Sequence, residues 1–383
     1  MKPVILILLG AYWPGHESTG PNISVRAMCD ALSDSFDFRI VARDRALDDP
    51  TQLGSHGMWH DAGYARIRYL PIGPARVGAI GLTEVLRDTP HHVLWSNGFF
   101  DREFTIPALM ARRLNRFPRR PMILSPRGEF SDGALGLKAL RKTVYRRTAT
   151  LLGLTRNVVF HATSDQEESD VRAALPHAPI LRLANFRPLF ALPPHQPRAP
   201  GMPLRAAFLG RISPVKGLAL ALDALAETAV PVDYTIYGPI SERDHWEECQ
   251  AKIAVLPAHI RVRYAGELTN DAVAATMSGQ DVLFLPSHSE NFGHAIFEAL
   301  CAGTPVLVGN RTPWHDLEAQ RAGYDLPLGD PTSFARALER LHALDEATAS
   351  QWRAGARAVA ERFVRSSTAM IDTTCALRRL ATS

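Results

Sequence analysis

The sequence predicts an α/β protein with two Rossmann-like, doubly wound domains. Short apolar runs alternate with helical patterns along the whole chain, which is typical of parallel sheets covered by helices. The 383 residues suffice for two domains of roughly 150 to 200 residues, each with its own core. The segment 193–203 holds five prolines, so it can form neither a helix nor a central strand and is predicted to link the domains.

The composition is that of a soluble globular protein. Hydrophobic residues make up 46% of the chain and charged residues 21%, and no apolar run approaches the ~20 residues that a membrane span needs. The run 4–9 is too short for a secretory signal and is predicted to be a buried strand. The four cysteines are scattered, which favours a reducing, cytoplasmic compartment and no structural zinc site. The net charge of +4 permits an anionic partner without naming one.

The first predicted domain, residues 1–192, begins with a strand, a turn and a helix over 22–33. Gly20 lies beside the helix start, where backbone can approach a ligand closely. The pattern G-x-G-x-x-G is missing, which disfavours a nicotinamide-dependent dehydrogenase, and Asp44 is therefore predicted to be a turn residue. Further strands are predicted over 38–42, 67–70, 92–95, 122–125 and 158–162.

Two loops of this domain, 96–100 and 125–129, follow strands and are predicted to open on the same crevice. Arg127, beside a glycine, can reach a phosphate or a sugar there; the alternative is a solvated arginine in a polar turn.

A basic amphipathic helix is predicted over Leu137 to Arg147. Its cations, interleaved with Leu140, Val144 and Tyr145, are Lys138, Arg141, Lys142, Arg146 and Arg147. Such a helix is usually only a solvated face, but it can also rest on anionic lipid headgroups or hold a lipid-linked pyrophosphate. Five arginines between 112 and 120 add weight to contact with the inner face of a membrane.

The second predicted domain, residues 204–366, repeats the alternating pattern. Strands are predicted over 206–209, 233–237 and 260–264, and a long helix over 345–363. The tail 367–383 is amphipathic and is predicted to return toward the first domain.

The stretch 281–303 is the most informative part of this domain. An apolar strand ends at Pro286, a helix begins near Gly293, and Gly303 ends that helix. The loop therefore leaves the carboxyl end of a parallel strand, and the helix start is suited to an anion. Glu290 and Glu298, eight positions apart, would accept hydrogen bonds from hydroxyls, so a nucleoside-diphosphate sugar fits best. The alternative is that both are ordinary surface carboxylates.

The turn 209–217 supplies two cations. Arg211 offers planar bidentate donation to phosphate oxygens, and Lys216 offers a compact charge. Together they can hold a diphosphate and stabilise it as it leaves. The spacing of these two cations alone is a weak pattern. The carboxylate pair follows further along the same predicted domain, at a distance that lets both motifs meet at one edge of the sheet.

At these residues the chain resembles family 4 of the retaining nucleotide-sugar glycosyltransferases, which have the GT-B fold of two facing Rossmann-like domains with an interdomain cleft. The matching features are Gly210-Arg211 with Lys216-Gly217, the Glu290 and Glu298 pair, the Gly20 loop and the segment 312–316. The resemblance covers essentially the whole chain and is strongest in the second domain.

The resemblance implies a role for each matching position. Arg211 and Lys216 would bind the donor diphosphate, Glu290 the transferred sugar and Glu298 the ribose. The remaining predicted donor-binding residues are Gly20, Gly210, Gly238, Glu267, Leu268, Asn291, Phe292 and Gly293, with Glu267 and Leu268 at the edge of the base pocket. Arg127 stands where many members have a histidine, in a Ser-Pro-Arg-Gly loop shared with members resembling bacterial surface-polysaccharide transferases. The predicted catalytic set is Glu290, Arg211, Lys216 and Arg127.

The predicted reaction is a retaining transfer to a hydroxyl of a glycan or lipid-linked saccharide, in which the departing β-phosphate takes the acceptor proton. No D-x-D follows a strand, so two cations would do the work of a metal ion and no metal or other cofactor is expected. The alternatives are a nucleotide-sugar hydrolase or epimerase on the same fold, and a non-catalytic nucleotide-sugar binding protein.

Overall fold

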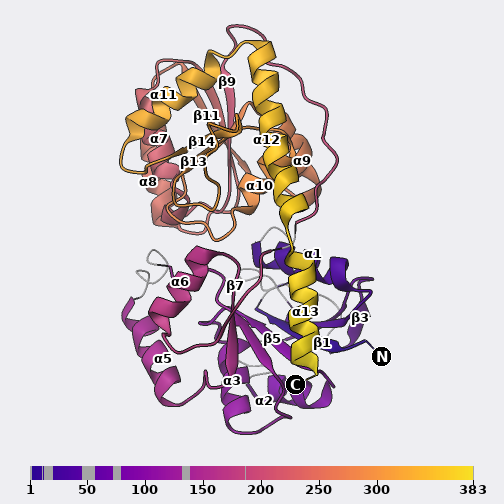
Figure 1. The fold of residues 1–383 in the computed structure, drawn as a ribbon. Coiled ribbons are helices and arrows are strands. Elements are labelled where there is room, and N and C mark those ends of the chain that lie inside the picture. The colour runs from indigo at the N-terminus through magenta and orange to yellow at the C-terminus, as the bar shows by residue number, and fades with distance from the viewer. Residues whose placement is uncertain are drawn as a thin grey trace. The chain divides into compact units, whose positions relative to one another are not determined.

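The computed structural model describes residues 2–10, 12, 20–44, 57–71, 79–131, 139–185 and 187–382. They form two compact units, Met1–Arg187 with Ser367–Ser383 and Pro188–Ser366 (Figure 1). Each unit is a parallel or largely parallel sheet covered by helices, so the predicted α/β, doubly wound architecture is confirmed.

The N-terminal unit contains an eight-stranded sheet in the order β3-β4-β2-β1-β5-β6-β7-β8. Its strands are β1 Val4–Leu9, β2 Asp37–Arg43, β3 Trp59–Asp61, β4 Arg66–Leu70, β5 Val93–Asn97, β6 Met122–Ser125, β7 Val158–Ala162 and β8 Ile180–Arg182. Only the β3–β4 pair is antiparallel. Every residue of β1 is buried, because helices cover both faces of a central parallel strand.

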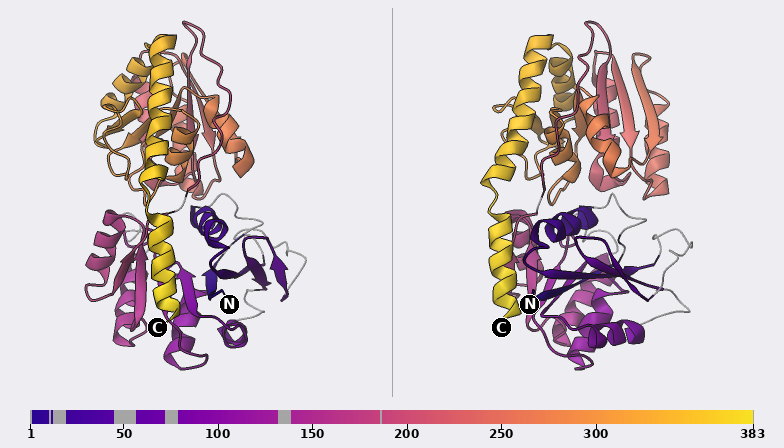
Figure 2. Two further views of the ribbon diagram at one scale, coloured as in Figure 1. Left: turned by 45° about the vertical axis from the view of Figure 1, so that its right-hand side comes forward. Right: turned by 90° about the vertical axis from the view of Figure 1, so that its right-hand side faces the viewer.

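Six helices of the described residues belong to this unit. They are α1 Gly20–Leu32, α2 Ala79–Asp88, α3 Thr105–Arg113, α5 Ala139–Leu151, α6 Asp165–Ala174 and α13 Ala369–Ala381. One core lies under α1 and α13, and a second core lies under the other four helices. The two views in Figure 2 show α13, in yellow, running alongside this unit.

The C-terminal unit contains six parallel strands in the order β11-β10-β9-β12-β13-β14. The strands are β9 Leu204–Leu209, β10 Val232–Tyr237, β11 Ile260–Gly266, β12 Val282–Leu285, β13 Val306–Gly309 and β14 Gly323–Leu326. The helices are η1 Pro214–Lys216, α7 Leu218–Glu227, α8 Arg243–Ile253, α9 Asn270–Ser278, α10 His294–Cys301, α11 Pro331–His342 and α12 Glu346–Ser366. Helices α7, α8 and α11 pack together on one side of the sheet, and α9, α10 and α12 on the other (Figures 1 and 2).

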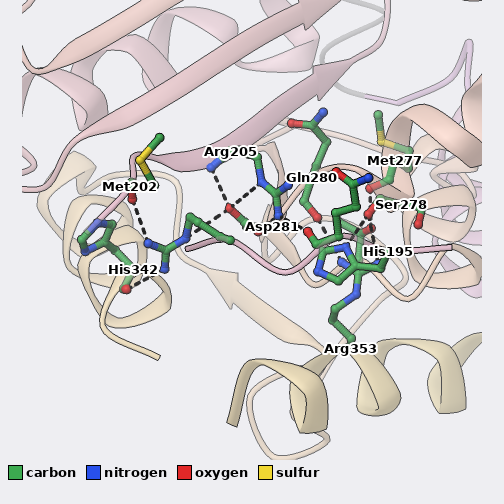
Figure 3. Close-up of polar contacts among 12 residues, drawn as sticks. His195, Met202, Arg205, Met277, Ser278, Gln280, Asp281, His342 and Arg353 are labelled. Atoms are coloured by element: carbon green, nitrogen blue, oxygen red, sulfur yellow. Dashed lines mark hydrogen bonds and ion pairs between the residues drawn. The ribbon is translucent and has the colours of Figure 1, made fainter. Parts of the chain in front are cut away.

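The chain passes from one unit to the other at Arg187–Pro188, before the segment 193–203 that was predicted to be the linker. That segment packs against the C-terminal unit, because its carbonyls and side chains find partners there (Figure 3). Ser278 Oγ donates to the Pro194 carbonyl at 2.7 Å, and His195 Nδ1 donates to the Ser278 carbonyl at 2.7 Å. Prolines lack N–H donors but keep their acceptors, so a proline-rich stretch can still be tied down.

The tail forms α13, whose residues Ala369, Thr373 and Leu377 are buried in the N-terminal unit. Within the described ranges, no helix combines the length and hydropathy needed to cross a membrane.

Candidate functional site

The carboxyl ends of three neighbouring strands in the C-terminal unit are joined by backbone contacts, one of which requires glycine. Gly210 N–H donates to the Tyr237 carbonyl, and Gly238 N–H donates to the Gly266 carbonyl. Gly238 has a φ of 134°, and a Cβ there would lie 2.0 Å from the Gly210 carbonyl oxygen. The predicted donor residues Gly210 and Gly238 therefore serve to bring two loops into direct backbone contact.

The loop after β9 lies against the loop after β12. Gly217 begins α7 with a left-handed φ of 73°, and a Cβ there would lie 2.0 Å from the Pro286 carbonyl oxygen. His288 N–H donates to the Val215 carbonyl at 2.8 Å. The two segments that the sequence singled out, 209–217 and 281–303, are thus held together at one edge of the sheet.

Lys216 and Glu290 meet at this junction. The Lys216 ammonium lies 2.6 Å from Glu290 Oε1, and Ser287 Oγ donates to the same oxygen at 2.8 Å. The side chain of Glu290 is only 9% exposed and that of Lys216 is 20% exposed, so the interpretation of Glu290 as a solvated surface carboxylate is wrong. A largely buried carboxylate is retained here because a cation and a hydroxyl satisfy it.

The indole of Trp314 fixes the turn that precedes α10. Trp314 Nε1 donates to the Phe292 carbonyl at 2.7 Å, and the two rings pack edge to face. Gly293 has a φ of 76°, and a Cβ there would lie 3.2 Å from Trp314 Nε1. The Asn291–Gly293 turn therefore presents the N-terminus of α10 beside Glu290, as predicted.

The remaining predicted donor residues lie around this junction. Arg211 follows Gly210, is exposed, and makes no hydrogen bond or ion pair with the residues that the structure describes. Glu298 is partly buried on α10, and at the end of β11 Glu267 is exposed while Leu268 packs partly against the core.

Ser287 and Trp314 are the site residues that sequence reasoning missed. Ser287 stands three positions before Glu290, a spacing at which a hydroxyl can reach a carboxylate, and this spacing was the available signal. Trp314 lies in the segment 312–316 that carried the family resemblance, but the sequence does not show which carbonyl its N–H reaches.

Arg127 and Gly20 belong to the N-terminal unit. Arg127 has a left-handed φ of 57°, and its Nε and Nη1 donate to the amide oxygens of Asn97 and Asn185 at 2.9 and 3.4 Å. Burial lowers the pKa of its guanidinium to about 10. The interpretation of Arg127 as a solvated turn residue is therefore wrong, and a partly buried cation held by neutral amides is suited to an anionic or hydroxyl-rich ligand.

The loop that carries Arg127 rests on a buried hydrogen-bond chain. Trp95 Nε1 donates to Ser125 Oγ at 2.8 Å, and Ser125 Oγ lies 2.7 Å from His161 Nδ1. His161 Nε2 faces the Leu183 carbonyl at 2.9 Å, so Nε2 carries the proton and Nδ1 accepts from Ser125. Burial lowers the pKa of His161 to about 4, which keeps this ring neutral.

A cavity of about 550 Å³ lies at the opposite, amino-terminal edge of the C-terminal sheet, beside α12. Arg353, which lines it, donates to the carbonyls of Ser278, Gln280 and Ala302 at the ends of α9 and α10. Asp281 is held by Arg205 at 2.6 Å (Figure 3). Arg353 thus ties the ends of α9 and α10 together, and the Arg205–Asp281 pair joins the starts of β9 and β12, at the other end of the strands from Lys216 and Glu290.

Parts of this chain are similar to known proteins. Residues 194–359, which include the Lys216–Glu290 junction, match the family model of the glycosyl transferases group 1. The whole chain also aligns with sucrose-phosphate synthase from Thermosynechococcus elongatus, at a TM-score of 0.73, 19% identity and 100% coverage of both chains. The predicted resemblance to glycosyltransferases of the GT-B fold is thereby confirmed.

The curated relatives match only part of the chain. The chain is 34% identical over 158 residues to the phosphatidyl-myo-inositol mannosyltransferase of Mycobacterium leprae, which is 40% of this chain and 41% of that protein. The matched part thus spans less than half the length of the curated relatives. The Anabaena protein HepE in complex with UDP-glucose has a TM-score of 0.70 at 15% identity, covering 99% of this chain and 100% of that chain.

Proposed function

We propose that this protein is a retaining glycosyltransferase that moves a sugar from a nucleoside-diphosphate sugar to a hydroxyl acceptor. The observation that carries the proposal is the contact between Lys216 and Glu290, which brings a diphosphate-binding cation and a hydroxyl-binding carboxylate within 2.6 Å of each other. The group 1 family match over the same residues supports it. So does the UDP-glucose complex of a structural neighbour.

In the proposed donor complex, the diphosphate lies against Lys216, Arg211 and the N-terminus of α10. Glu290 accepts hydrogen bonds from the sugar, and Glu298 accepts them from the ribose. Lys216 then exchanges part of its contact with Glu290 for phosphate oxygens. Ser287 continues to hold Glu290 during this exchange, because its hydroxyl already donates to the same carboxylate oxygen. Arg127 is proposed as a further cation for phosphate or sugar.

The proposed reaction exchanges one bond at the anomeric carbon for another on the same face. The bond to the β-phosphate oxygen breaks, the acceptor oxygen forms the new bond, and the acceptor proton passes to the departing phosphate. Arg211, Lys216 and the α10 N–H groups stabilise the charge that grows on the diphosphate. Proton NMR of the product with a defined donor tests retention, and an inverted anomeric centre would contradict this mechanism.

The proposed transfer needs no metal ion, since the two cations perform the electrostatic role. We expect EDTA to leave turnover unchanged, measured as nucleotide release with donor and acceptor present. Loss of turnover in EDTA, restored by Mg²⁺ or Mn²⁺, would show that a metal supplies part of the charge stabilisation.

For the acceptor, we propose a hydroxyl of a glycan or lipid-linked saccharide in cell-surface polysaccharide synthesis, reached on the cytoplasmic side of the membrane. The name of the mycobacterial relative, a phosphatidyl-myo-inositol mannosyltransferase, supports an acceptor that carries a lipid.

A panel of nucleotide sugars, incubated with and without a membrane extract, tests the proposal. We expect free nucleotide only when the extract supplies an acceptor. Sugar loss without an acceptor would instead indicate a hydrolase, isomerised donor an epimerase, and binding without any product a non-catalytic protein.

A further inference from the structure

The N-terminal unit exposes a cluster of large apolar side chains. Of the fourteen large hydrophobic residues that the described chain exposes, six lie on α3, on α5 and just after them. We call these six residues the α3–α5 face: Met110, Leu114, Leu140, Val144, Leu151 and Leu152. Leu140 is 78% exposed and Leu151 is 86% exposed, so this face is a concentrated patch and not scattered single residues.

The apolar side of α5 faces water. Leu140, Val144 and Leu151 lie four and eleven positions apart, which places them on one side of a helix with 3.6 residues per turn. Ala149, on the opposite side, is buried in the core of the unit. The helix is therefore anchored through Ala149 and Tyr145, and its leucines face away from the core. Figure 1 shows α5 on the outside of this unit.

The end of α3 joins the end of α5 in one surface. Arg113 Nε donates to the Leu152 carbonyl at 3.0 Å, which places Leu114 beside Leu151 and Leu152. Arg112 Nη2 donates to the carbonyls of Arg120 and Asn157, at 3.3 and 3.2 Å, and holds the following loop against the same surface. The end of α3, with Leu114, and the end of α5, with Leu151 and Leu152, thus meet at this hydrogen bond.

This face is surrounded by positive charge without any carboxylate from its own segments. Residues 104–128 and 139–164 contain no Asp or Glu, although the chain as a whole has 39 such residues and a net charge of only +4. The exposed cations next to the face are Arg113, Arg116, Arg119, Arg120, Arg141 and Arg147. Exposed leucines ringed by arginines are complementary to a surface that is apolar inside and anionic outside.

We propose that the α3–α5 face binds the surface of an anionic phospholipid bilayer, with its leucines in the acyl boundary and its arginines on the headgroups. The sequence predicted a membrane contact through the basic helix Leu137 to Arg147, of which Leu137 and Lys138 lie outside the described residues. The α3–α5 face runs along α5 from Leu140 near its start to Leu151 at its end, and it adds the end of α3. The proposal goes beyond sugar transfer and stands whether or not the protein is a transferase.

Co-sedimentation of the full-length protein with vesicles, without donor or acceptor, tests the proposal. We expect binding to phosphatidylcholine vesicles that contain phosphatidylglycerol, little binding to phosphatidylcholine alone, and weaker binding as NaCl screens the charges. Replacing both Leu140 and Leu151 by Glu is expected to lower the partition coefficient about tenfold or more. Replacing both Arg141 and Arg147 by Glu should lower it by roughly fivefold per cation or more.

Matched controls lie on exposed positions of the other unit. Val255→Glu and Arg336→Glu change an exposed aliphatic residue and an exposed arginine of the C-terminal unit, and both variants should bind vesicles as the wild type does. Equal binding to both kinds of vesicle, or full binding by the Leu140→Glu, Leu151→Glu variant, would overturn the proposal. It would also be overturned if the wild type ignored vesicles and instead self-associated through contacts that this double variant abolishes.

Discussion

Lys216 has an anionic partner in the structure, Glu290, and a second in the proposed function, the donor diphosphate. Its ammonium lies against Glu290, and both side chains are largely withdrawn from water. Removing one partner of such a pair leaves an uncompensated charge, which is costly. A diphosphate that draws on Lys216 leaves Glu290 with the Ser287 hydroxyl, and under the proposed function sugar hydroxyls would then take the place of the ammonium.

Glu129 is a second carboxylate with an unusual environment. Its Oε2 accepts the N–H groups of Phe99 and Phe100 at 2.5 and 3.1 Å, among the rings of Phe99, Phe100 and Phe130. Burial raises the pKa of this carboxyl from its usual 4.5 to about 7, although the two N–H groups work in the opposite direction. The folded state therefore holds this proton more tightly than the unfolded state does.

This shift predicts a pH-dependent stability. The unfolded chain ionises at the usual pKa, so between about pH 4.5 and 7 the contribution of Glu129 to stability should fall as pH rises, whereas that of His161 runs the other way. Glu129→Gln removes this titration and leaves His161 unchanged. We expect the variant to gain roughly 3 kcal/mol in free energy of unfolding relative to the wild type across this window. Urea denaturation at several pH values measures the difference; a difference that stays flat with pH would contradict the assignment.

The location of a site residue was predictable where a short sequence motif contains it. The positions of Lys216 and Glu290 followed from strand ends and spacing. The partners of Arg127 did not, because Asn97 and Asn185 lie 30 and 58 positions away in sequence and only the tertiary fold brings them together.

At the scale of elements, the site depends on how closely two loops approach. Gly217 has no room for a Cβ, since the Pro286 carbonyl oxygen would lie 2.0 Å from it. The backbone of the loop after β9 therefore packs directly on the end of β12, and Lys216 is delivered to Glu290 by that contact.

Gly217→Ala tests this packing. We expect it to lower the free energy of unfolding by more than about 3 kcal/mol, because the backbone must move as well as adopt a positive φ. Gly201→Ala is the matched control: Gly201 has a φ of 77°, close to that of Gly217, but nothing lies within 4 Å of its added Cβ. It should cost only about 1 to 2 kcal/mol. If chemical denaturation gave equal losses in free energy of unfolding for the two variants, the positive φ alone, and not the close packing, would explain why position 217 is glycine.

The central strands were predicted to within a few residues, because continuous apolar runs mark a strand buried on both faces. The strand predicted over 233–237, for example, is Val232–Tyr237. The short edge strands β3 Trp59–Asp61 and β8 Ile180–Arg182 were missed, since three residues that are half-buried or exposed carry no periodic pattern.

At the scale of the whole molecule, the two units are not two consecutive pieces of chain. Residues 367–383 return to the N-terminal unit, where α13 packs against α1 and Leu377 is fully buried. The amphipathic tail predicted this return, but the exact change of unit at Arg187–Pro188 was not predictable, because composition points to the more proline-rich segment that follows.

Leu377→Ala should therefore destabilise the N-terminal unit, although residue 377 lies near the C-terminal end of the sequence. We expect a loss of about 3 kcal/mol in free energy of unfolding from the cavity left in the core. Ile371→Ala, on the exposed face of the same helix, should change the free energy by less than about 0.5 kcal/mol. Hydrogen exchange would locate the effect: faster exchange confined to the C-terminal unit in the Leu377→Ala variant would be inconsistent with this packing.

The most direct test of the account is calorimetric titration of the protein with UDP, GDP, ADP and TDP, comparing the wild type with Lys216→Ala. Lys252→Ala, which removes a lysine of α8 that is paired with Asp223 of α7, is the control. We expect at least one nucleoside diphosphate to bind, and Lys216→Ala to weaken that binding about tenfold or more and to lower turnover by orders of magnitude, while Lys252→Ala binds as the wild type. Unchanged nucleoside diphosphate affinity in a folded Lys216→Ala variant would contradict the central claim.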